Sequence, residues 1–304
     1  MEAFHTDKRE WIQALFAEET PDFFYTADDG GLCAGDCRAV MRSMRPASAD
    51  LIFADPPYSL GKADWDSFAS ADAYLEFSME WISEASRVLK PTGTLYVCGF
   101  SEILADLRRP AMDYFHSCRW LVWHYKNKAN LGRDWGRSHE SILCLRKSEQ
   151  YVMNTDDVRI PYNAHTLRYP SHPQAETSQY NNGSRQEKWI PNPLGAKPKD
   201  VIEIPTTCNG MGEKTPHPTQ KPEELLRKII LASSTENQLV LDPFVGSGTT
   251  AVCARQLNRA FFGIDQNPEY LEWAVRRLES VQRRSIQEWM EYDRRVTARR
   301  EAIR

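Results

Sequence analysis

The chain has no long apolar run. None of its apolar segments approaches the roughly 20 residues that a membrane-spanning helix requires. Residues 1–16 mix acidic and basic side chains and lack the apolar centre of a signal peptide. We therefore expect no membrane partner and a cytoplasmic location. With 41% hydrophobic residues among 304, the composition is that of a globular protein with a substantial core.

Spacings of cysteine and histidine that hold disulfides or metals are missing. The seven cysteines are odd in number and never form a Cys-x-x-Cys pattern, so neither a disulfide framework nor a zinc site is predicted. The seven histidines show no His-x-x-x-His spacing. We expect most cysteines to be small core residues, and we predict no bound metal.

A charge of one sign does not dominate the chain. Lys and Arg number 38 and Asp and Glu number 42, for a net charge of −4, which argues against a surface that is basic throughout. Between residues 119 and 200, however, Lys and Arg outnumber Asp and Glu. This stretch is the expected basic face of the protein.

Short apolar runs alternate with amphipathic stretches along most of the chain. This alternation predicts an α/β fold with a mostly parallel sheet. The expected strands are 31–36, 49–58, 93–100, 120–126, 140–147, 237–244 and 259–266. The expected helices are 37–44, 73–90, 222–234, 250–258 and 267–284.

Two stretches break this pattern. Residues 150–215 lose the periodicity and are rich in Pro, Asn, Ser, Tyr and Trp, which predicts an insertion made mainly of loops. Residues 281–304 are rich in arginine and poor in apolar side chains, which is typical of an exposed helical tail.

A glycine turn follows the strand at 237–244. Gly246 and Gly248 stand where the chain turns into a helix, so the backbone can approach a ligand closely. The next strand ends in Asp265, whose carboxylate can accept both hydroxyls of a ribose. The third glycine of a dinucleotide site and the Gly-Lys-Ser/Thr of a phosphate loop are absent, which favours a nucleoside cofactor without a pyrophosphate.

The strand at 49–58 ends in Asp55, Pro56, Pro57 and Tyr58. Two prolines lack an N–H group and fix φ, so they cannot continue a central strand, and the chain leaves the sheet as a rigid turn. The Asp55 carboxylate, the Pro56 carbonyl and the Tyr58 ring are then presented at the carboxyl end of a strand, where α/β sheets bind ligands.

Such a turn suits chemistry on the exocyclic amino group of a base. This nitrogen is a poor nucleophile, because its lone pair is delocalised into the ring. A carboxylate and a carbonyl can accept both of its hydrogens and free the lone pair for in-line attack on a sulfonium methyl. Tyr58 offers a face on which a flipped base can stack. An acid that merely caps the next segment is ordinary for Asp-Pro alone, but not for the whole tetrapeptide.

In its order of motifs the chain resembles the β class of amino-methyltransferases that act on DNA. That family has the Asp-Pro-Pro-Tyr motif first, the target-recognition region second and the glycine loop last, as 55–58, 150–215 and 242–250 do here. The resemblance extends over about residues 31–280 and includes internal motifs at 87–93, 139–143 and 217–222. It implies a circularly permuted Rossmann-like sheet of seven strands, mostly parallel, with a loop-rich target-recognition insertion.

The resemblance also implies a division of the chain. Its parts are an N-terminal extension at 1–30, the catalytic half of the methyltransferase domain at 31–149, the target-recognition insertion at 150–215, the cofactor-binding half at 216–280 and a C-terminal helical tail at 281–304.

By the same resemblance the cofactor is S-adenosyl-L-methionine. Asp55, Pro56, Pro57 and Tyr58 are the implied catalytic residues. Lys221, at the start of a helix, suits the carboxylate of the cofactor. The implied cofactor-binding residues are Asp36, Asp55, Thr219, Gln220, Lys221, Asp242, Phe244, Gly246, Gly248, Thr249, Thr250 and Asp265.

Double-stranded DNA is the implied partner, in a restriction-modification setting of prokaryotic, plasmid or phage type, with the target base flipped out of the helix. Candidates for DNA contact are the basic residues Lys126, Lys128, Arg133, Arg168 and Arg185. A solvated loop without a role in binding contains the same residue types. The recognition sequence, a cognate restriction enzyme and the oligomeric state, including a homodimer, stay open.

Adenine N6 is the expected target. N4 of cytosine is the alternative within the same chemistry, but that branch more often has Ser where Asp55 stands. Methylation at ring carbon C5 is excluded, because it needs a cysteine nucleophile, usually after proline, and no cysteine here follows one. A catalytically silent DNA-binding specificity partner is the alternative of a different class, and the intact Asp55, Tyr58 and Asp265 argue against it.

Overall fold

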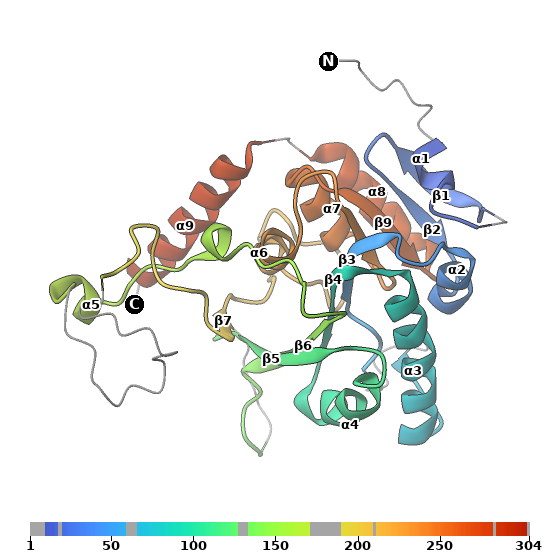
Figure 1. Ribbon diagram of the computed structural model, residues 1–304, viewed down its shortest axis with the longest axis horizontal. Helices are drawn as coiled ribbons and strands as arrows, with labels where there is room; N and C mark the ends of the chain where they lie inside the picture. The colour runs from blue at the N-terminus through green and yellow to red at the C-terminus, as the bar shows by residue number, and fades with distance from the viewer. Residues whose placement is uncertain are drawn as a thin grey trace. The chain divides into compact units, whose positions relative to one another are not determined.

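The computed structural model of the chain describes residues 10–17, 20–58, 66–126, 133–170, 190–208, 211–281 and 284–302 (Figure 1). Helices and strands alternate along most of it. In chain order they are α1 (Glu10–Gln13), β1 (Phe23–Ala27), β2 (Gly30–Ala34), α2 (Cys37–Ser43), β3 (Ala49–Ala54), α3 (Ala71–Val88), β4 (Leu89–Gly99), α4 (Ser101–Ala111), β5 (Ser117–His124), β6 (His139–Arg146), the 3-10 helix η2 (Thr155–Val158), α5 (Ala164–Arg168), β7 (Val201–Glu203), α6 (Glu223–Ser233), β8 (Leu239–Asp242), α7 (Thr249–Gln256), β9 (Ala260–Asp265), α8 (Pro268–Ser280) and α9 (Ile286–Ala302).

The chain forms two compact units. The larger unit contains residues 1–153 and 200–304, and the smaller contains residues 154–199. The smaller unit holds η2 and α5, and a bridge between Ile160 and Ala196 closes it. It falls inside the insertion expected at 150–215 and is narrower, because residues 201–203 return to the sheet as β7.

The sheet of the larger unit has the strand order β1-β2-β9-β8-β3-β4-β6-β5-β7. Neighbours from β2 to β4 pair in parallel, whereas β6 runs antiparallel to both β4 and β5. The strand that follows β8 along the chain, β9, lies on one side of the β8–β3 pair, and the strand that follows β3, β4, lies on the other side. The boundary between β8 and β3 is thus the point where an α/β sheet opens a crevice for a ligand.

The seven strands expected from the sequence form the uninterrupted centre of this sheet, and the Rossmann-like, circularly permuted class is confirmed. The expected count of seven strands was too low, because the described residues contain nine. The two additional strands, β1 and β7, lie at opposite edges. Neither strand contains a fully buried residue, and β7 exposes Val201 and Glu203, so neither is a strand covered on both faces.

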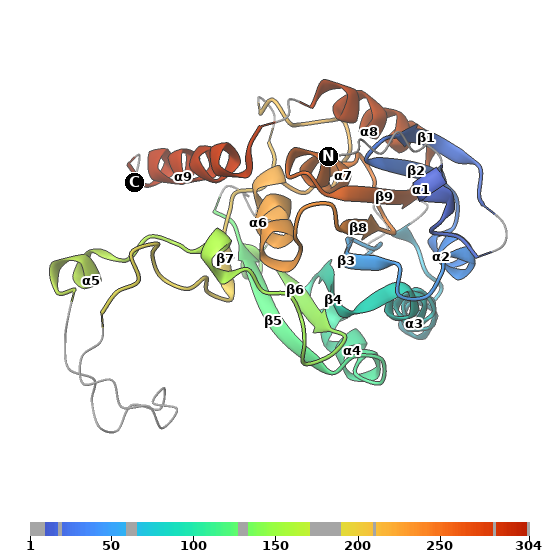
Figure 2. The same ribbon diagram turned by 45° about the horizontal axis from the view of Figure 1, so that its top comes forward.

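Helices cover both faces of the sheet. Figures 1 and 2 show α2, α3 and α4 on one side and α6, α7 and α8 on the other. The helix α4 was not expected, since Pro110 and paired arginines interrupt its sequence. The proline lies in the last turn, however, where it ends the helix without breaking it.

β3, the strand that leads into the Asp55 to Tyr58 turn, is a buried central strand. All six of its residues are buried, and it pairs with β4 on one side and β8 on the other. Strands that are covered on both faces are mainly apolar, as β3 is from Leu51 to Ala54, and the one buried charge of β3, Asp50, pairs with Lys90 at 2.8 Å. The strand stops at Ala54, because Pro56 and Pro57 have no N–H to give a neighbouring strand.

The N-terminal segment is part of the larger unit and not a separate extension. Ile12 and Phe16 are buried in the core, and β1 pairs with β2. Arg255 of α7 forms an ion pair with Asp29 at 2.6 Å, which connects the turn between β1 and β2 to α7.

The C-terminal tail is helical, as the sequence predicted. Within α9, Asp293 forms an ion pair with Arg227 of α6 at 2.6 Å, and the guanidinium of Arg227 lies over the Trp289 ring. The tail therefore has one packed face and is not simply a frayed end.

Five of the seven cysteines are buried and all seven are free thiols, which confirms their expected role as core residues. None of the helices within the described residues combines the length and the apolar character that a membrane crossing needs.

Candidate active site

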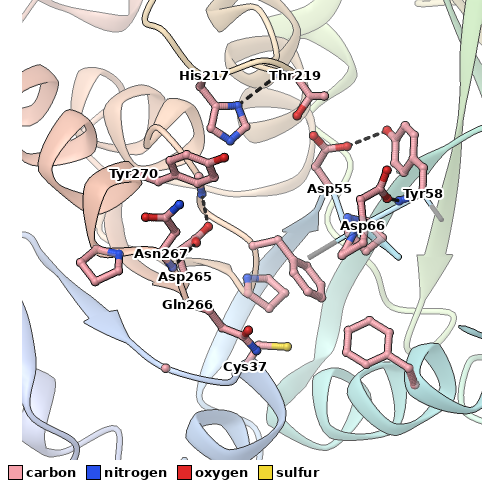
Figure 3. Close-up of a pocket in the computed structure, with 18 of the residues that line it drawn as sticks. Cys37, Asp55, Tyr58, Asp66, His217, Thr219, Asp265, Gln266, Asn267 and Tyr270 are labelled. Atoms are coloured by element: carbon pink, nitrogen blue, oxygen red, sulfur yellow. Dashed lines mark hydrogen bonds between the residues drawn. The ribbon is translucent and has the colours of Figure 1, made fainter. Parts of the chain in front are cut away.

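A pocket of about 410 Å³ opens at the carboxyl ends of the central strands (Figure 3). Residues that follow β2, β3, β8 and β9 line it. Figure 3 shows Asp55 and Tyr58 on one side of the pocket and His217, Asn267 and Tyr270 on the other. The pocket lies where the strand order reverses, which is the position expected for a ligand in such a sheet.

The turn after β3 is held in place at several points. The Tyr58 N–H donates to the buried Asp66 carboxylate at 2.6 Å, and the Pro57 carbonyl accepts a hydrogen bond from Tyr74 of α3 at 2.8 Å. The Tyr58 ring lies 5.0 Å from the ring of Phe100. A rigid turn is required if its carboxylate and carbonyl are to meet an incoming group without rearrangement.

Asp55 belongs to a buried cluster of polar groups from four parts of the chain. Its Oδ2 lies 2.6 Å from Nζ of Lys221, and its Oδ1 accepts a hydrogen bond from the Tyr58 hydroxyl at 2.6 Å. Oε2 of Glu140, at the start of β6, lies 3.1 Å from the Tyr58 hydroxyl and 3.4 Å from Lys221 Nζ. Cys98 of β4 donates to the same oxygen at 3.6 Å.

Burial and pairing act in opposite directions on these charges. Burial raises the pKa of Asp55, and the ammonium of Lys221 limits that rise. Burial alone would lower the pKa of Lys221, but Asp55 and Glu140 outweigh it and raise the pKa. Glu140 is also buried, yet Lys221 and the Tyr58 hydroxyl lower its pKa. The ammonium of Lys221, 2.6 Å from Asp55, favours the ionised form of that acid.

The opposite end of the pocket is formed by the loop between β8 and α7. Gly246 and Gly248 have φ values of 49° and 82°, in the region that L side chains rarely adopt. At Gly248 a Cβ would also lie 2.6 Å from Cβ of Ala274, so glycine is needed there for two reasons. The loop therefore brings its backbone close to α8 and to the pocket.

Two buried carboxylates fix this loop. Asp265, at the end of β9, accepts hydrogen bonds from the N–H groups of Gly246 at 2.8 Å and Asn267 at 2.9 Å. Asp242, at the end of β8, accepts from the Phe244 N–H at 2.9 Å and from the Thr250 hydroxyl. Of the two carboxylates, Asp265 lines the pocket and Asp242 lies behind it.

Burial raises the pKa of both of these acids. For Asp242 the pKa reaches about 7, because burial outweighs the hydrogen bonds from Thr250 and Phe244. Burial likewise raises the pKa of Asp265 against the hydrogen bonds of Asn267 and Gly246. No cation forms an ion pair with either acid among the described residues, in contrast to Asp55.

His217 and Tyr270 form a wall between the two ends. Their ring centroids lie 4.5 Å apart, and a Cβ at Gly246 would lie 3.0 Å from Nε2 of His217. Nδ1 of His217 accepts a hydrogen bond from the Thr219 N–H at 3.3 Å, which requires this nitrogen to be unprotonated. Burial and the nearby Lys221 lower the pKa of His217 to about 4, in agreement with a neutral ring.

An apolar wall completes the pocket. Phe68, Phe77 and Phe244 line it together with Cys37. The Phe244 ring packs edge-on against Trp81 of α3 at 5.3 Å, so it is held firmly where it meets the pocket. A planar, partly apolar group such as a nucleobase suits this wall.

The structure brings most of the expected site residues together, in two layers. Those that line the pocket are Asp55, Pro56, Pro57, Tyr58, Thr219, Phe244, Gly246 and Asp265. Gln220, Lys221, Asp242, Gly248, Thr249 and Thr250 are not among the lining residues and support it from behind. Asp36 does not line the pocket either, although its neighbours Gly35 and Cys37 do, because its carboxylate caps α2 and pairs with Arg38 at 2.6 Å.

The expected DNA-contacting residues are more scattered. Lys126 and Arg133 are exposed in the segment between β5 and β6, and Lys126 lies 3.3 Å from Glu203. Arg168 is exposed at the end of α5 in the smaller unit. Lys128 and Arg185 lie outside the described residues.

Sequence reasoning missed four residues of the site. Glu140 was noted only as part of a motif, and Asp66, His217 and Tyr270 were given no role. A buried acid at a strand start was the available signal for Glu140, since such a carboxylate needs a partner. Asp66 and Tyr270 carry no signal of this kind in the sequence, because only the folded chain brings each of them to the pocket.

Asp55, Cys98 and Glu140 offer ligand atoms within 4.8 Å of one another, a spacing that would suit a metal ion. The ammonium of Lys221, however, lies within 3.4 Å of both carboxylates and supplies the positive charge at that point.

Comparison with known proteins agrees with this geometry. A family described as DNA methylase matches residues 49–276. The chain is 36% identical over 256 residues to Type II methyltransferase M.HpaI of Haemophilus parainfluenzae, covering 82% of this chain and 74% of that protein. It is 33% identical over 270 residues to DNA adenine methyltransferase YhdJ of Escherichia coli (strain K12), covering 86% and 87%.

Solved structures share the fold at lower identity. The PvuII DNA methyltransferase (cytosine-N4-specific) matches with a TM-score of 0.65 and 17% identity, over 91% of this chain and 95% of that one. The M1.HpyAVI-SAM complex matches with a TM-score of 0.55 and 22% identity, over 82% and 98%. The fold is thus that of a methyltransferase. Because the family match spans most of the chain, the chain belongs to the DNA methylase family.

Proposed function

We propose that this protein transfers a methyl group from S-adenosyl-L-methionine to N6 of adenine in double-stranded DNA, at a specific sequence. The observation that carries the proposal is the Asp55 to Tyr58 turn, which lies on the rim of the same pocket that the glycine loop and Asp265 close at the other end. A methyl donor and a base can therefore meet without leaving this pocket.

The residues of the pocket fit the cofactor. Asp265 is positioned to accept the ribose hydroxyls, and Gly246 leaves a cradle that a side chain would fill, since a Cβ there would lie 3.0 Å from His217. The wall formed by Phe244 and Phe77 suits the adenine. A volume of about 410 Å³ is in the range of small-molecule sites.

When bound, S-adenosyl-L-methionine supplies an electrophilic methyl group on a sulfonium sulfur. The Asp55 carboxylate and a carbonyl of the proline turn accept the two hydrogens of the base amino group and so release its lone pair. When the methyl group passes from sulfur to the nitrogen, the cofactor would leave as a neutral thioether, and Asp55 would accept the proton that the nitrogen loses. The Tyr58 ring provides a stacking face for the base.

The base must leave the double helix to reach this turn. Flipping costs a few kcal/mol, and less where the base is mispaired. Lys126 and Arg133 lie at the edge of the sheet where Glu140 and Asp55 are found, and we assign them contacts with DNA phosphates. Within this proposal the insertion at 150–215 recognises the DNA sequence, and no metal is required. The protein works in a prokaryotic cytoplasm and is of plasmid or phage type. The chain forms homodimers.

The test is the product. DNA from a host that expresses the protein is digested and its nucleosides are analysed by mass spectrometry, with the Asp55→Ala variant as the matched control. We expect N6-methyl-2′-deoxyadenosine from the parent and none from the variant. N4-methylcytosine as the only product would overturn the base assignment. Calorimetric binding of S-adenosyl-L-methionine by the parent, without any methylated product, would point to a silent DNA-binding partner.

A further inference from the structure

Lys221 is a buried cation that faces the catalytic turn and not the cofactor pocket. Its Nζ lies 2.6 Å from Asp55 and 3.4 Å from Glu140, and it is not among the residues that line the pocket. Two residues earlier in the chain, Thr219 does line it. The segment that borders the cofactor therefore also delivers a charge to the catalytic carboxylate.

We propose that Lys221 and Glu140 are positioning residues for Asp55: Lys221 holds the carboxylate ionised and oriented, and Glu140 holds Lys221 between the two acids. The inference deepens the proposed function and rests on it. It replaces the expectation that Lys221 binds the carboxylate of the cofactor.

The geometry of Asp55 requires such a partner. Burial without a nearby cation raises the pKa of a carboxyl group, and a protonated acid has lost part of its capacity to accept the amino hydrogens. Lys221 occupies Oδ2 and the Tyr58 hydroxyl occupies Oδ1. Each oxygen accepts more than one hydrogen bond, so capacity remains for the base.

Glu140 makes the arrangement stable. Lys221 carries three N–H donors, and a single acid would leave part of that buried ammonium unsatisfied. Glu140 accepts a hydrogen bond from the Cys98 thiol at 3.6 Å, and its Oε2 lies 3.1 Å from the Tyr58 hydroxyl, whose shorter contact is with Asp55. The negative charge of Glu140 nevertheless opposes ionisation of Asp55. The two positioning residues therefore affect the protonation of Asp55 in opposite directions.

Several other groups act on Asp55. The thiol of Cys98 on β4 contacts Glu140, and the hydroxyls of Tyr58 and Tyr74 lie near Asp55 on the turn and on α3. Asp242 at the end of β8 also interacts electrostatically with Asp55. Of all these groups only Lys221 is a cation, so its removal is the substitution that changes the charge balance most.

The experiment compares Lys221→Met, Lys221→Arg and Glu140→Gln with the parent. Single-turnover methyl transfer to DNA from cells that lack adenine methylation is measured from pH 5 to 9, and S-adenosyl-L-methionine binding is measured by calorimetry. Activity requires ionised Asp55, so it falls as the pH drops below the pKa of that acid. Lys221→Met should lower the rate about 10²-fold or more and move this acidic limb to higher pH, with cofactor affinity within about threefold, a shift on the order of 0.6 kcal/mol.

Glu140→Gln should move the acidic limb to lower pH, opposite to Lys221→Met, and Lys221→Arg should restore part of the lost rate because it keeps the charge. A purely structural role predicts no opposed shifts. The matched control is Lys90→Met, which breaks the pair between Lys90 and Asp50 at the start of β3 and should leave the limb where it is.

Two results would overturn the inference. One is weaker cofactor binding by Lys221→Met with an unchanged rate at saturating cofactor, which would return Lys221 to the cofactor carboxylate. The other is an acidic limb that Glu140→Gln leaves in place or moves upward, which decides the matter even if Lys221→Met does not fold. The rate of the parent reports on the proposed function, whereas differences between parent and variants report on Lys221 and Glu140 alone.

Discussion

The two ends of the pocket hold their buried carboxylates by different means. At the catalytic end, Asp55 is held by side chains, with Lys221 and the Tyr58 hydroxyl each at 2.6 Å. At the glycine-loop end, Asp265 is held by main-chain N–H groups of the turns that it organises, and Asp242 by one such group and a hydroxyl.

The difference concerns which property of each carboxylate its neighbours control, its protonation or its position. Side chains that surround Asp55 set its protonation, so substituting a neighbour changes its chemistry. Main-chain donors cannot be substituted, so the acids at the other end respond only to changes in the path of the loop. This difference agrees with the proposed function, in which the first end takes part in the reaction and the second provides a fixed surface for the cofactor.

The largest expected effect is that of Asp55→Ala. Loss of a positioned acceptor typically costs ~10²–10⁴ in rate, while the affinity for S-adenosyl-L-methionine should stay within several-fold because Asp265 and the glycine loop are untouched. Steady-state kinetics and calorimetry test both parts. A variant with a rate within tenfold of the parent, a loss under about 1.4 kcal/mol, would show that this carboxylate does not act on the substrate.

Asp265→Ala should produce the opposite pattern. A hydrogen bond to a charged group contributes about 1.5–3 kcal/mol, so we expect cofactor affinity to fall roughly 10- to 100-fold with a much smaller change in the rate at saturating cofactor. The same two measurements apply. Equal losses in cofactor affinity and in maximal rate would contradict the assignment of different roles to the two ends of the pocket.

Gly248→Ala tests the shape of the loop directly. Its φ is 82° and the added Cβ would lie 2.6 Å from Ala274 Cβ. A strained residue of this kind costs about 1–3 kcal/mol, which denaturant unfolding would detect. Gly212→Ala is a suitable control, because a Cβ there meets nothing within 4 Å. Equal stability of the two variants would contradict the packing described for α8.

The last prediction concerns the pH dependence of stability. Because the pKa of His217 is lowered to about 4 in the folded protein, its unfolded form binds a proton first as the pH falls from 6.5. The contribution of His217 to the free energy of unfolding is complete above pH 6.5 and is lost progressively as the pH falls through about 4. Unfolding free energies should therefore decline more steeply across this range for the parent than for His217→Gln. Parallel curves would mean that the imidazole is not held neutral.

Much of the fold could be predicted from the sequence, because its information is local. The central strands are mainly apolar runs covered on both faces, and Pro56 and Pro57 indicate where β3 ends. The edge strand β7 could not be predicted, since three residues become a strand only when β5 offers them partners. The same holds for Ile12 and Phe16, whose burial depends on the completed sheet.

The candidate site divides in the same way. Asp55 and Gly248 stand in motifs whose spacing indicates their roles. The pairing of Lys221 with Asp55 and Glu140 joins segments far apart in the chain, and no local pattern shows that a lysine at a helix start turns toward one pocket end and away from the other. Only the fold decides which carboxylate it meets.

The larger unit fixes both points where the chain leaves for residues 154–199 and returns from them. The Val152 N–H donates to the Thr92 carbonyl at 3.2 Å, and the Val122 N–H donates to the Asp200 carbonyl at 2.7 Å. Both contacts use only the main chain, so they do not depend on which side chains evolution places between them. The segment can therefore diverge, lengthen or be exchanged between related genes while β3, β8 and their carboxylates keep their register. Under the proposed function, in which residues 150–215 read the DNA sequence, a change of specificity in this segment leaves the Asp55 to Tyr58 turn unchanged.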